Sequence, residues 1–97
     1  MYTLFFSAHF ERKTKKLIKQ RPTVKKPLEK ALSLLRQNPQ AQPLKTHQAL
    51  AKVDGKPARS SFVTKDLRII WRFDRDQIRL INLIDIGGHG GKRKVYK

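Results

Sequence analysis

The order of apolar and polar positions at the start of the chain predicts a short strand that leads into a helix. Residues 2–7 read YTLFFS, and this alternating run, rich in aromatic residues, suits a strand with one buried face. Ser7 has the side chain of a helix N-cap, and apolar positions recur at helical spacing from Phe10 onward. Pro22 cannot continue a helix, so we expect the first helix to end just before it.

A second helical stripe follows directly. Its apolar positions are spaced as on one face of a helix: Leu28, Ala31, Leu32 and Leu35. Thr23 is a candidate N-cap, and the regular part is expected to start near Pro27. Asn38 and Pro39 predict its end. Two antiparallel helices joined around Pro22 would form a hairpin whose apolar stripes need a sheet to cover.

The rest of the chain predicts that sheet. Residues 39–58 are rich in Pro and Lys and predict a loop with one short helical turn. Apolar and β-branched positions predict strands at about 59–63 and at 67–73, and the DRDQ segment at 74–77 predicts a hairpin turn. Trp71 alternates with apolar neighbours and is expected in the core rather than on an RNA-stacking surface.

The last predicted strand, 78–86, is expected to lie inside the sheet because both of its faces are apolar. Strict alternation divides its apolar residues between two faces, with Ile78, Leu80, Ile84 and Ile86 on one and Ile81 and Leu83 on the other. The order β-α-α-β-β-β therefore predicts an α+β domain. In it, a helical hairpin packs on a mostly antiparallel four-stranded sheet.

Net charge extends the prediction from the fold to the partner. The 97 residues hold 23 Lys and Arg against 7 Asp and Glu, a formal net charge of +16 that is spread over both halves. A surface with this much self-repulsion favours an anionic partner, and nucleic acid fits better than an anionic membrane or an acidic protein alone. With 38% hydrophobic residues, a chain of this length suits one core, so we expect residues 1–97 to form a single domain.

Three absences from the sequence narrow the class of protein further. The chain has no cysteine, which excludes thiol catalysis, disulfides and thiolate metal sites and agrees with a cytoplasmic location. Its apolar start is broken by Ser7 and His9, so neither a signal peptide nor a membrane span is expected. His9 is expected only to open the first helix. Metal-ligand spacing is also lacking, and we expect no metal and no small-molecule cofactor.

Three short segments resemble the RelE/ParE toxin superfamily. They are DLRIIW at 66–71, LIDIGGH at 83–89 and an aromatic residue near the C-terminus, Tyr96. The upstream LKTHQAL at 44–50 is similar to the YafQ-like branch, which has a histidine in the loop before its sheet. The resemblance implies a compact ribonuclease that cuts mRNA, commonly on the ribosome. It also implies a co-encoded antitoxin that holds the enzyme inactive.

The same resemblance implies a catalytic set of five residues: His47, Asp66, Arg68, His89 and Tyr96. Metal-independent RNA cleavage needs a base for the ribose 2′-hydroxyl, cations for the phosphorane and an acid for the departing 5′-oxygen. Histidine, with a reference pKa of about 6.5, can act as base or acid. Asp66 would orient or charge one imidazole, and the planar guanidinium of Arg68 would contact the scissile phosphate.

Two departures from the branch bear on these catalytic roles. Phe62 stands where relatives have a further histidine, and the GGKRK stretch separates His89 from Tyr96 more widely than usual.

Basic residues around the loop and near the C-terminus are expected to bind the RNA backbone: Lys45, Lys52, Lys56, Arg59, Lys92, Arg93 and Lys94.

The expected partners are mRNA, on the ribosome, and a cognate acidic antitoxin protein. Two alternatives stay open. A ParE-like toxin that inhibits DNA gyrase needs no acid-base residues, so the pair His47 and His89 argues against it. A noncatalytic basic RNA-binding protein would need only the net charge.

Overall fold

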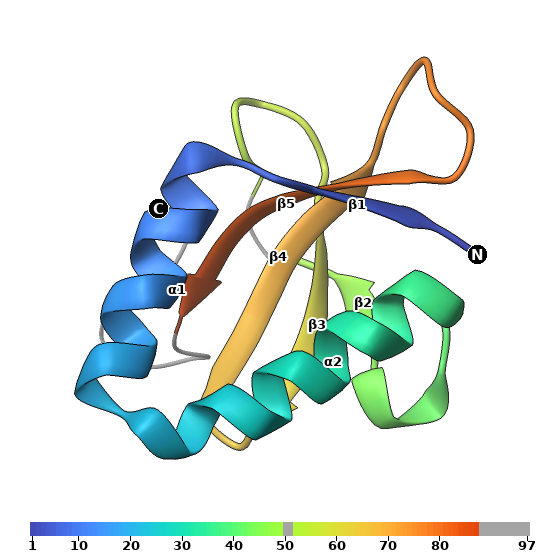
Figure 1. Cartoon of the computed structure of the whole chain (residues 1–97). Coiled ribbons are helices and arrows are strands. Elements are labelled where there is room, and N and C mark those ends of the chain that lie inside the picture. The colour runs from blue at the N-terminus through green and yellow to red at the C-terminus, as the bar shows by residue number, and fades with distance from the viewer. Residues whose placement is uncertain (50–51, 88–97) are drawn as a thin grey trace.

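The structure is a computed structural model that describes residues 1–49 and 52–87 (Figure 1). In chain order its elements are β1 (Thr3–Phe6), α1 (Ala8–Gln20), η1 (Pro22–Val24), α2 (Lys25–Gln37), η2 (Gln42–Leu44), β2 (His47–Gln48), β3 (Arg59–Thr64), β4 (Leu67–Phe73) and β5 (Leu80–Gly87). The fold is α+β, as the sequence predicts. Both helices lie in the first half of the chain, and most of the sheet comes from the second.

The sheet has five strands in the order β1-β5-β4-β3-β2, so the prediction of four strands is wrong. The extra strand is β2, where His47 and Gln48 pair with Ser60 and Arg59 of β3. Two residues are too few to produce an alternating pattern, and the sequence therefore predicts a loop in this segment. β1 runs parallel to β5, and the other neighbours are antiparallel. As expected, β5 is an inner strand.

The helices begin and end close to the predicted positions. Ser7 caps α1 as expected, since its Oγ accepts the backbone N–H of Phe10 at 3.1 Å. Thr23 does not cap α2, which continues from the short 3₁₀ turn η1 and has no side-chain cap. None of the helices in the described part of the chain has the length and apolar character that crossing a bilayer requires.

α1 and α2 do not pack along each other as the predicted hairpin would. α1 packs on β5 and α2 on β3, while η1 joins them and contacts both (Figure 1). Each helix therefore buries its own apolar stripe against a different part of the sheet. The two helices cover one face and leave the other face to the loops.

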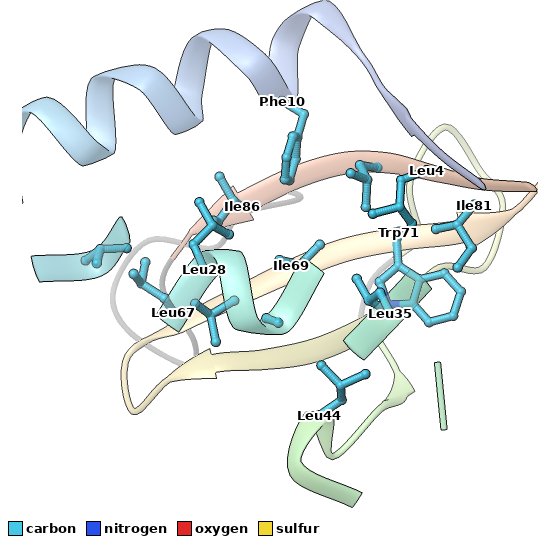
Figure 2. Packing of buried hydrophobic residues seen from close by; sticks show 14 residues of the cluster. Leu4, Phe10, Leu28, Leu35, Leu44, Leu67, Ile69, Trp71, Ile81 and Ile86 are labelled. Carbon is cyan, nitrogen blue, oxygen red and sulfur yellow. The ribbon is translucent and has the colours of Figure 1, made fainter. Parts of the chain in front are cut away.

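The main core lies between the helices and this face of the sheet (Figure 2). Its fully buried large side chains include Phe10, Leu35, Leu44, Ile69, Trp71, Ile81, Leu83 and Ile86. Trp71 is completely buried, which confirms its predicted place in the core. Its indole Nε1 donates to Ser61 Oγ at 2.7 Å, so the polar edge of the ring is satisfied inside the core.

A β-bulge changes the faces predicted for β5. The register between β4 and β5 shifts so that Ile84 has no partner on β4. Ile81, Leu83 and Ile86 consequently all face the helices, whereas strict alternation assigned Ile86 to the face opposite Ile81 and Leu83. Ile78 is outside the strand and 90% exposed, because the turn from β4 extends further than the DRDQ segment.

A smaller apolar cluster lies apart from the main core, on the other face of the sheet. It consists of Ala49, Ala58 and Ile70, with Val53 and Ile84 packed against them. Arg72 Nη2 donates to the carbonyl oxygen of Val53 at 3.1 Å. This contact and the cluster hold the loop between β2 and β3 against the sheet, beside the candidate site.

Candidate functional site

The candidate site lies on the sheet face that the helices leave free, where β3 and β4 run side by side. Phe62 of β3 is paired with Arg68 of β4. Because Ile69 points into the core, the alternation of the strand turns Arg68 to the opposite face. The guanidinium carbon of Arg68 lies 5.5 Å from the centroid of the Phe62 ring, and Lys45 Nζ lies 5.2 Å from it. We call Lys45, Phe62 and Arg68 the cationic cluster.

Arg68 is the member of the cluster with unused hydrogen-bonding capacity. Its Nε and Nη1 atoms are buried and have no hydrogen-bond partner among the described residues. A buried donor without a partner costs roughly 1–3 kcal/mol, and more when the group is charged. A phosphate oxygen would satisfy these donors with a charge-assisted hydrogen bond. The cluster therefore has the chemistry of an anion site.

Lys45 is held beside Phe62 by an uncommon backbone conformation. It ends the 3₁₀ turn η2 with φ 47° and ψ 43°, in the left-handed region that side chains other than Gly, Asn and Asp rarely adopt. Such a conformation costs on the order of 1 kcal/mol and persists where the surrounding structure requires it. Here it follows the buried Leu44 and directs the chain into β2.

His47 lies on β2, on the same face as the cationic cluster. It is paired with Ser60, and Ser60 and Phe62 are two residues apart on β3, so their side chains share a face. From strand spacing, with Ser60 paired to Ile70 and Arg68 two residues further along β4, the Cα atoms of His47 and Arg68 are about 12 Å apart.

The hydrogen bonding of His47 favours one tautomer. Its Nδ1 lies 3.0 Å from the carbonyl oxygen of Lys45, which can only accept, so the proton of the neutral ring belongs on Nδ1. The Nε2 atom then keeps its lone pair. The imidazole is exposed, so a general base at this position is open to a substrate.

Asp66 lies in the turn between β3 and β4, with its own partners. Its carboxylate accepts a hydrogen bond from Thr64 Oγ1 at 2.9 Å and lies 3.4 Å from Arg21 Nη1. The Thr64 hydroxyl, and after it the Arg21 guanidinium, hold the pKa of the Asp66 carboxyl below its usual value. Asp66 is therefore ionised near neutral pH and cannot act as the acid. Among the described residues its partners are these two rather than His47.

Part of the predicted site falls on residues that the structure does not describe. These are His89 and Tyr96 of the catalytic set and Lys92, Arg93 and Lys94 of the RNA-binding set. The described chain ends at Gly87, which is paired with Arg68. β5 thus carries the chain to the cationic cluster.

The remaining basic residues of the RNA-binding set do not form one surface. Lys52 and Lys56 are exposed on the loop that packs against the face of the cluster. Arg59 alternates away from Phe62, and its guanidinium carbon lies 5.6 Å from the centroid of the Phe73 ring. Of the predicted RNA contacts in the described part of the chain, Lys45 alone is in the cationic cluster.

A second polar group, which the sequence analysis did not identify, lies where α1 meets β5. The side chain of Asp85 is 9% exposed, and its Oδ1 accepts from Lys13 Nζ at 2.9 Å and from the backbone N–H of Ile86 at 2.8 Å. His9 Nε2 lies 3.1 Å from the same oxygen, so His9 does more than open the helix. A lone carboxylate within the apolar LINLIDIG strand is the sequence signal that would have identified this group.

No protein-family model matches the chain, and no curated protein matches it. Solved structures do match. A chain of the E. coli DinJ-YafQ toxin-antitoxin complex is 21% identical, with TM-score 0.69 and coverage of 91% of this chain and 92% of that one. A metal-bound toxin from Helicobacter pylori is 25% identical, with TM-score 0.70 and coverage of 92% and 96%.

A third structure, the YoeB/ParE toxin from Agrobacterium tumefaciens, is 12% identical, with TM-score 0.70 and coverage of 90% of this chain and 98% of that one. In all three the match extends over nearly the whole of both chains. The structure therefore resembles those of the RelE/ParE-like toxin superfamily, including YafQ.

Proposed function

We propose that this protein is the toxin of a toxin-antitoxin pair and an endoribonuclease that cleaves mRNA on the ribosome without a metal ion or other cofactor. The single observation that carries the proposal is Arg68, whose buried Nε and Nη1 have no partner among the described residues. These donors lie in the cationic cluster, on the sheet face that the helices leave free in a RelE-like fold. The positive charge of the whole molecule adds to it.

Each described residue of the site has a chemical role in this proposal. His47 Nε2 removes the proton of the ribose 2′-hydroxyl, since its Nδ1 is occupied by the Lys45 carbonyl. Arg68 and Lys45 stabilise the negative charge that develops on the phosphorane. Asp66 stays ionised and keeps the β3–β4 turn attached to Arg21. With His47 as the base, His89 is left as the proposed acid for the departing 5′-oxygen, and Tyr96 completes the catalytic set that the resemblance implies.

The proposed protein partner is a cognate acidic antitoxin. A similar chain occurs in the E. coli DinJ-YafQ toxin-antitoxin complex, and a net charge of +16 favours an acidic partner on electrostatic grounds. Co-expression with the product of a neighbouring acidic reading frame should relieve growth inhibition. A protein that is harmless alone at high expression would count against this part of the proposal.

The deciding experiment is an RNA cleavage assay on the purified protein, with and without ribosomes. The expected products carry a 2′,3′-cyclic phosphate or its opened form and a free 5′-hydroxyl, and cleavage should continue in chelator. DNA gyrase supercoiling is measured in parallel. Intact RNA together with inhibited gyrase would transfer the assignment to the ParE-like alternative. Binding of RNA without either effect would favour the noncatalytic one.

A further inference from the structure

A groove of about 410 Å³ lies between α2, the turn η2 and β3, next to the cationic cluster. Figure 1 shows α2 and the segment after it beside β3. The apolar wall on α2 is made of Pro27, Ala31 and Leu34, and Leu44 and Val63 face it from the turn and the strand. Phe62 also lines the groove, so the groove and the cluster share this ring.

The chemistry of the lining favours an apolar side chain over a nucleobase. Apart from two lysines, none of the described residues that line the groove has a side chain that forms hydrogen bonds. Base recognition in a pocket requires donors and acceptors for the edge of the base, commonly with aromatic stacking. Phe62 is the one aromatic residue in the described part of the lining, and it already contacts two cations. Leu, Ile or Val side chains would fill the groove without leaving polar groups unpaired.

The positive charge around the groove favours an occupant that has acidic residues next to its apolar side chain. Lys26 and Lys30 are exposed on α2, four residues apart on the same face of the helix. Lys45 adds a third ammonium group beside Phe62. Among the residues that the structure describes, no acidic side chain lines the groove. An occupant with carboxylates beside its apolar residues is therefore complementary in charge.

We propose that this groove binds an acidic segment of a partner protein through apolar anchor residues, and that the segment controls the cationic cluster through Phe62. The inference rests on the proposed function, in which the partner is the antitoxin. A segment seated in the groove presses on the ring that both Lys45 and Arg68 contact. It can thus alter the anion site from the side, without filling it.

The test uses NMR titration of the full chain with three synthetic peptides of equal length and an RNA oligonucleotide. One peptide alternates Glu with Leu, one alternates Glu with Ser, and one alternates Lys with Leu. The Glu-Leu peptide should shift the amide signals of Ala31, Leu34 and Val63 and extend to Phe62 and Arg68. The other two peptides should bind weakly, because each lacks one of the two required features.

Matched charge reversals locate the site. The double variant Lys26→Glu with Lys30→Glu should weaken Glu-Leu peptide binding by roughly tenfold or more. The control reverses Lys15 and Lys19, which have the same spacing on an exposed part of α1. Equal weakening by both pairs, or shifts confined to residues away from the groove, would overturn the inference. RNA that occupies the groove in competition with the peptide would also overturn it.

Cleavage of RNA by the same samples separates this inference from the function on which it rests. If the protein cleaves RNA but does not bind the Glu-Leu peptide in the groove, the proposed function stands and the inference is wrong. If the protein binds the peptide in the groove but does not cleave RNA, the groove is a docking surface and the proposed ribonuclease activity is wrong. Inhibition of cleavage by the Glu-Leu peptide, lost in the Lys26 and Lys30 double variant, is the expected result.

Discussion

At the scale of single residues, the candidate site depends on contacts between side chains that are distant in sequence. Arg68 and Lys45 meet on the ring of Phe62, the residue that departs from the histidine of the YafQ-like branch. The departure removes a titratable group and supplies an aromatic face for two cations instead. In this chain the described site therefore combines one histidine with a cation-π cluster.

Replacing Arg68 tests the anion site directly. Arg68→Ala should slow RNA cleavage by about 10²–10³-fold, because a preorganised donor acts on the charge of the phosphorane, and should weaken RNA binding only modestly. Arg68→Lys should not restore the rate, since an ammonium group lacks the planar fork. Single-turnover kinetics measure both effects. Arg75→Ala, in the exposed turn before β5, is the matched control and should cleave normally.

Replacing His47 removes the proposed proton-transfer group without removing a buried contact, so its effect on cleavage is the simplest to interpret. His47→Gln and His47→Ala should each slow cleavage by roughly 10²–10⁴-fold. Circular dichroism should show normal folding, because the ring is exposed and, within the described chain, its one hydrogen bond is to the Lys45 carbonyl. A variant that cleaves RNA at the original rate would remove His47 from the mechanism.

The Asp66 carboxyl has a pKa whose direction and causes can be measured. NMR titration should give a value below the usual 3.8, and Thr64→Val should raise it more than Arg21→Ala, because the Thr64 hydroxyl is the larger cause. With the folded pKa lowered, the contribution of Asp66 to stability is present above pH 3.8 and is lost as the pH falls through the folded pKa. Asp74 is the internal control. Asn82 chiefly lowers its pKa, so neither variant should move it.

At the scale of elements, α1 covers the part of β5 that β1 leaves unpaired. β1 covers β5 only from Leu80 to Leu83, and α1 lies against the strand beyond that point (Figure 1). Asp85 is the polar attachment there, and it follows the bulge at Ile84. The bulge allows Asp85 to reach α1 while Ile86 stays in the core.

Removing the two sides of this attachment should have unequal effects on stability. Asp85→Ala should lower the free energy of unfolding by about 1–3 kcal/mol, because it leaves the buried backbone N–H of Ile86 without the carboxylate that accepts from it. Lys13→Met should cost less, since the Lys13 side chain is 39% exposed and solvent screens the pair. Urea denaturation measures both. A larger loss in Lys13→Met would contradict the buried-acceptor account.

At the scale of the whole molecule, unbalanced positive charge is the dominant property. Of the basic side chains in the described residues, only His9, Lys13 and Arg21 lie within ion-pair distance of a carboxylate. The excess charge is therefore free to act on a partner. Part of this charge lies over the sheet face that the helices leave free and along the rim of the α2–β3 groove.

This excess predicts the salt dependence of RNA binding. The logarithm of the association constant should fall linearly with the logarithm of salt concentration, by roughly 0.7 for each phosphate contacted on a single strand. Lys45→Ala should reduce the magnitude of the slope by about one contact. Fluorescence anisotropy with a labelled oligonucleotide provides the measurement. Affinity that does not change between low and physiological salt would remove the polyanion interpretation.

The sequence by itself determined the features that depend on local spacing. Helical and alternating patterns predicted both helices and the strands other than β2, Ser7 identified the start of α1, and the apolar surroundings of Trp71 put it in the core. The composition by itself fixes the formal net charge of +16. These predictions need only the periodicity of one segment, because each residue's preferred environment is encoded by its immediate neighbours.

Only the tertiary structure decided which residues meet. The pairing of β2 with β3, the bulge that turns Ile86 into the core, and the contacts of Arg68 with Phe62 and of Asp66 with Arg21 all join segments distant along the chain or shift a register. A one-residue shift reverses the faces of a strand, and no local pattern specifies it. Packing of the helices against the sheet selects the register, and the register sets the geometry of the site.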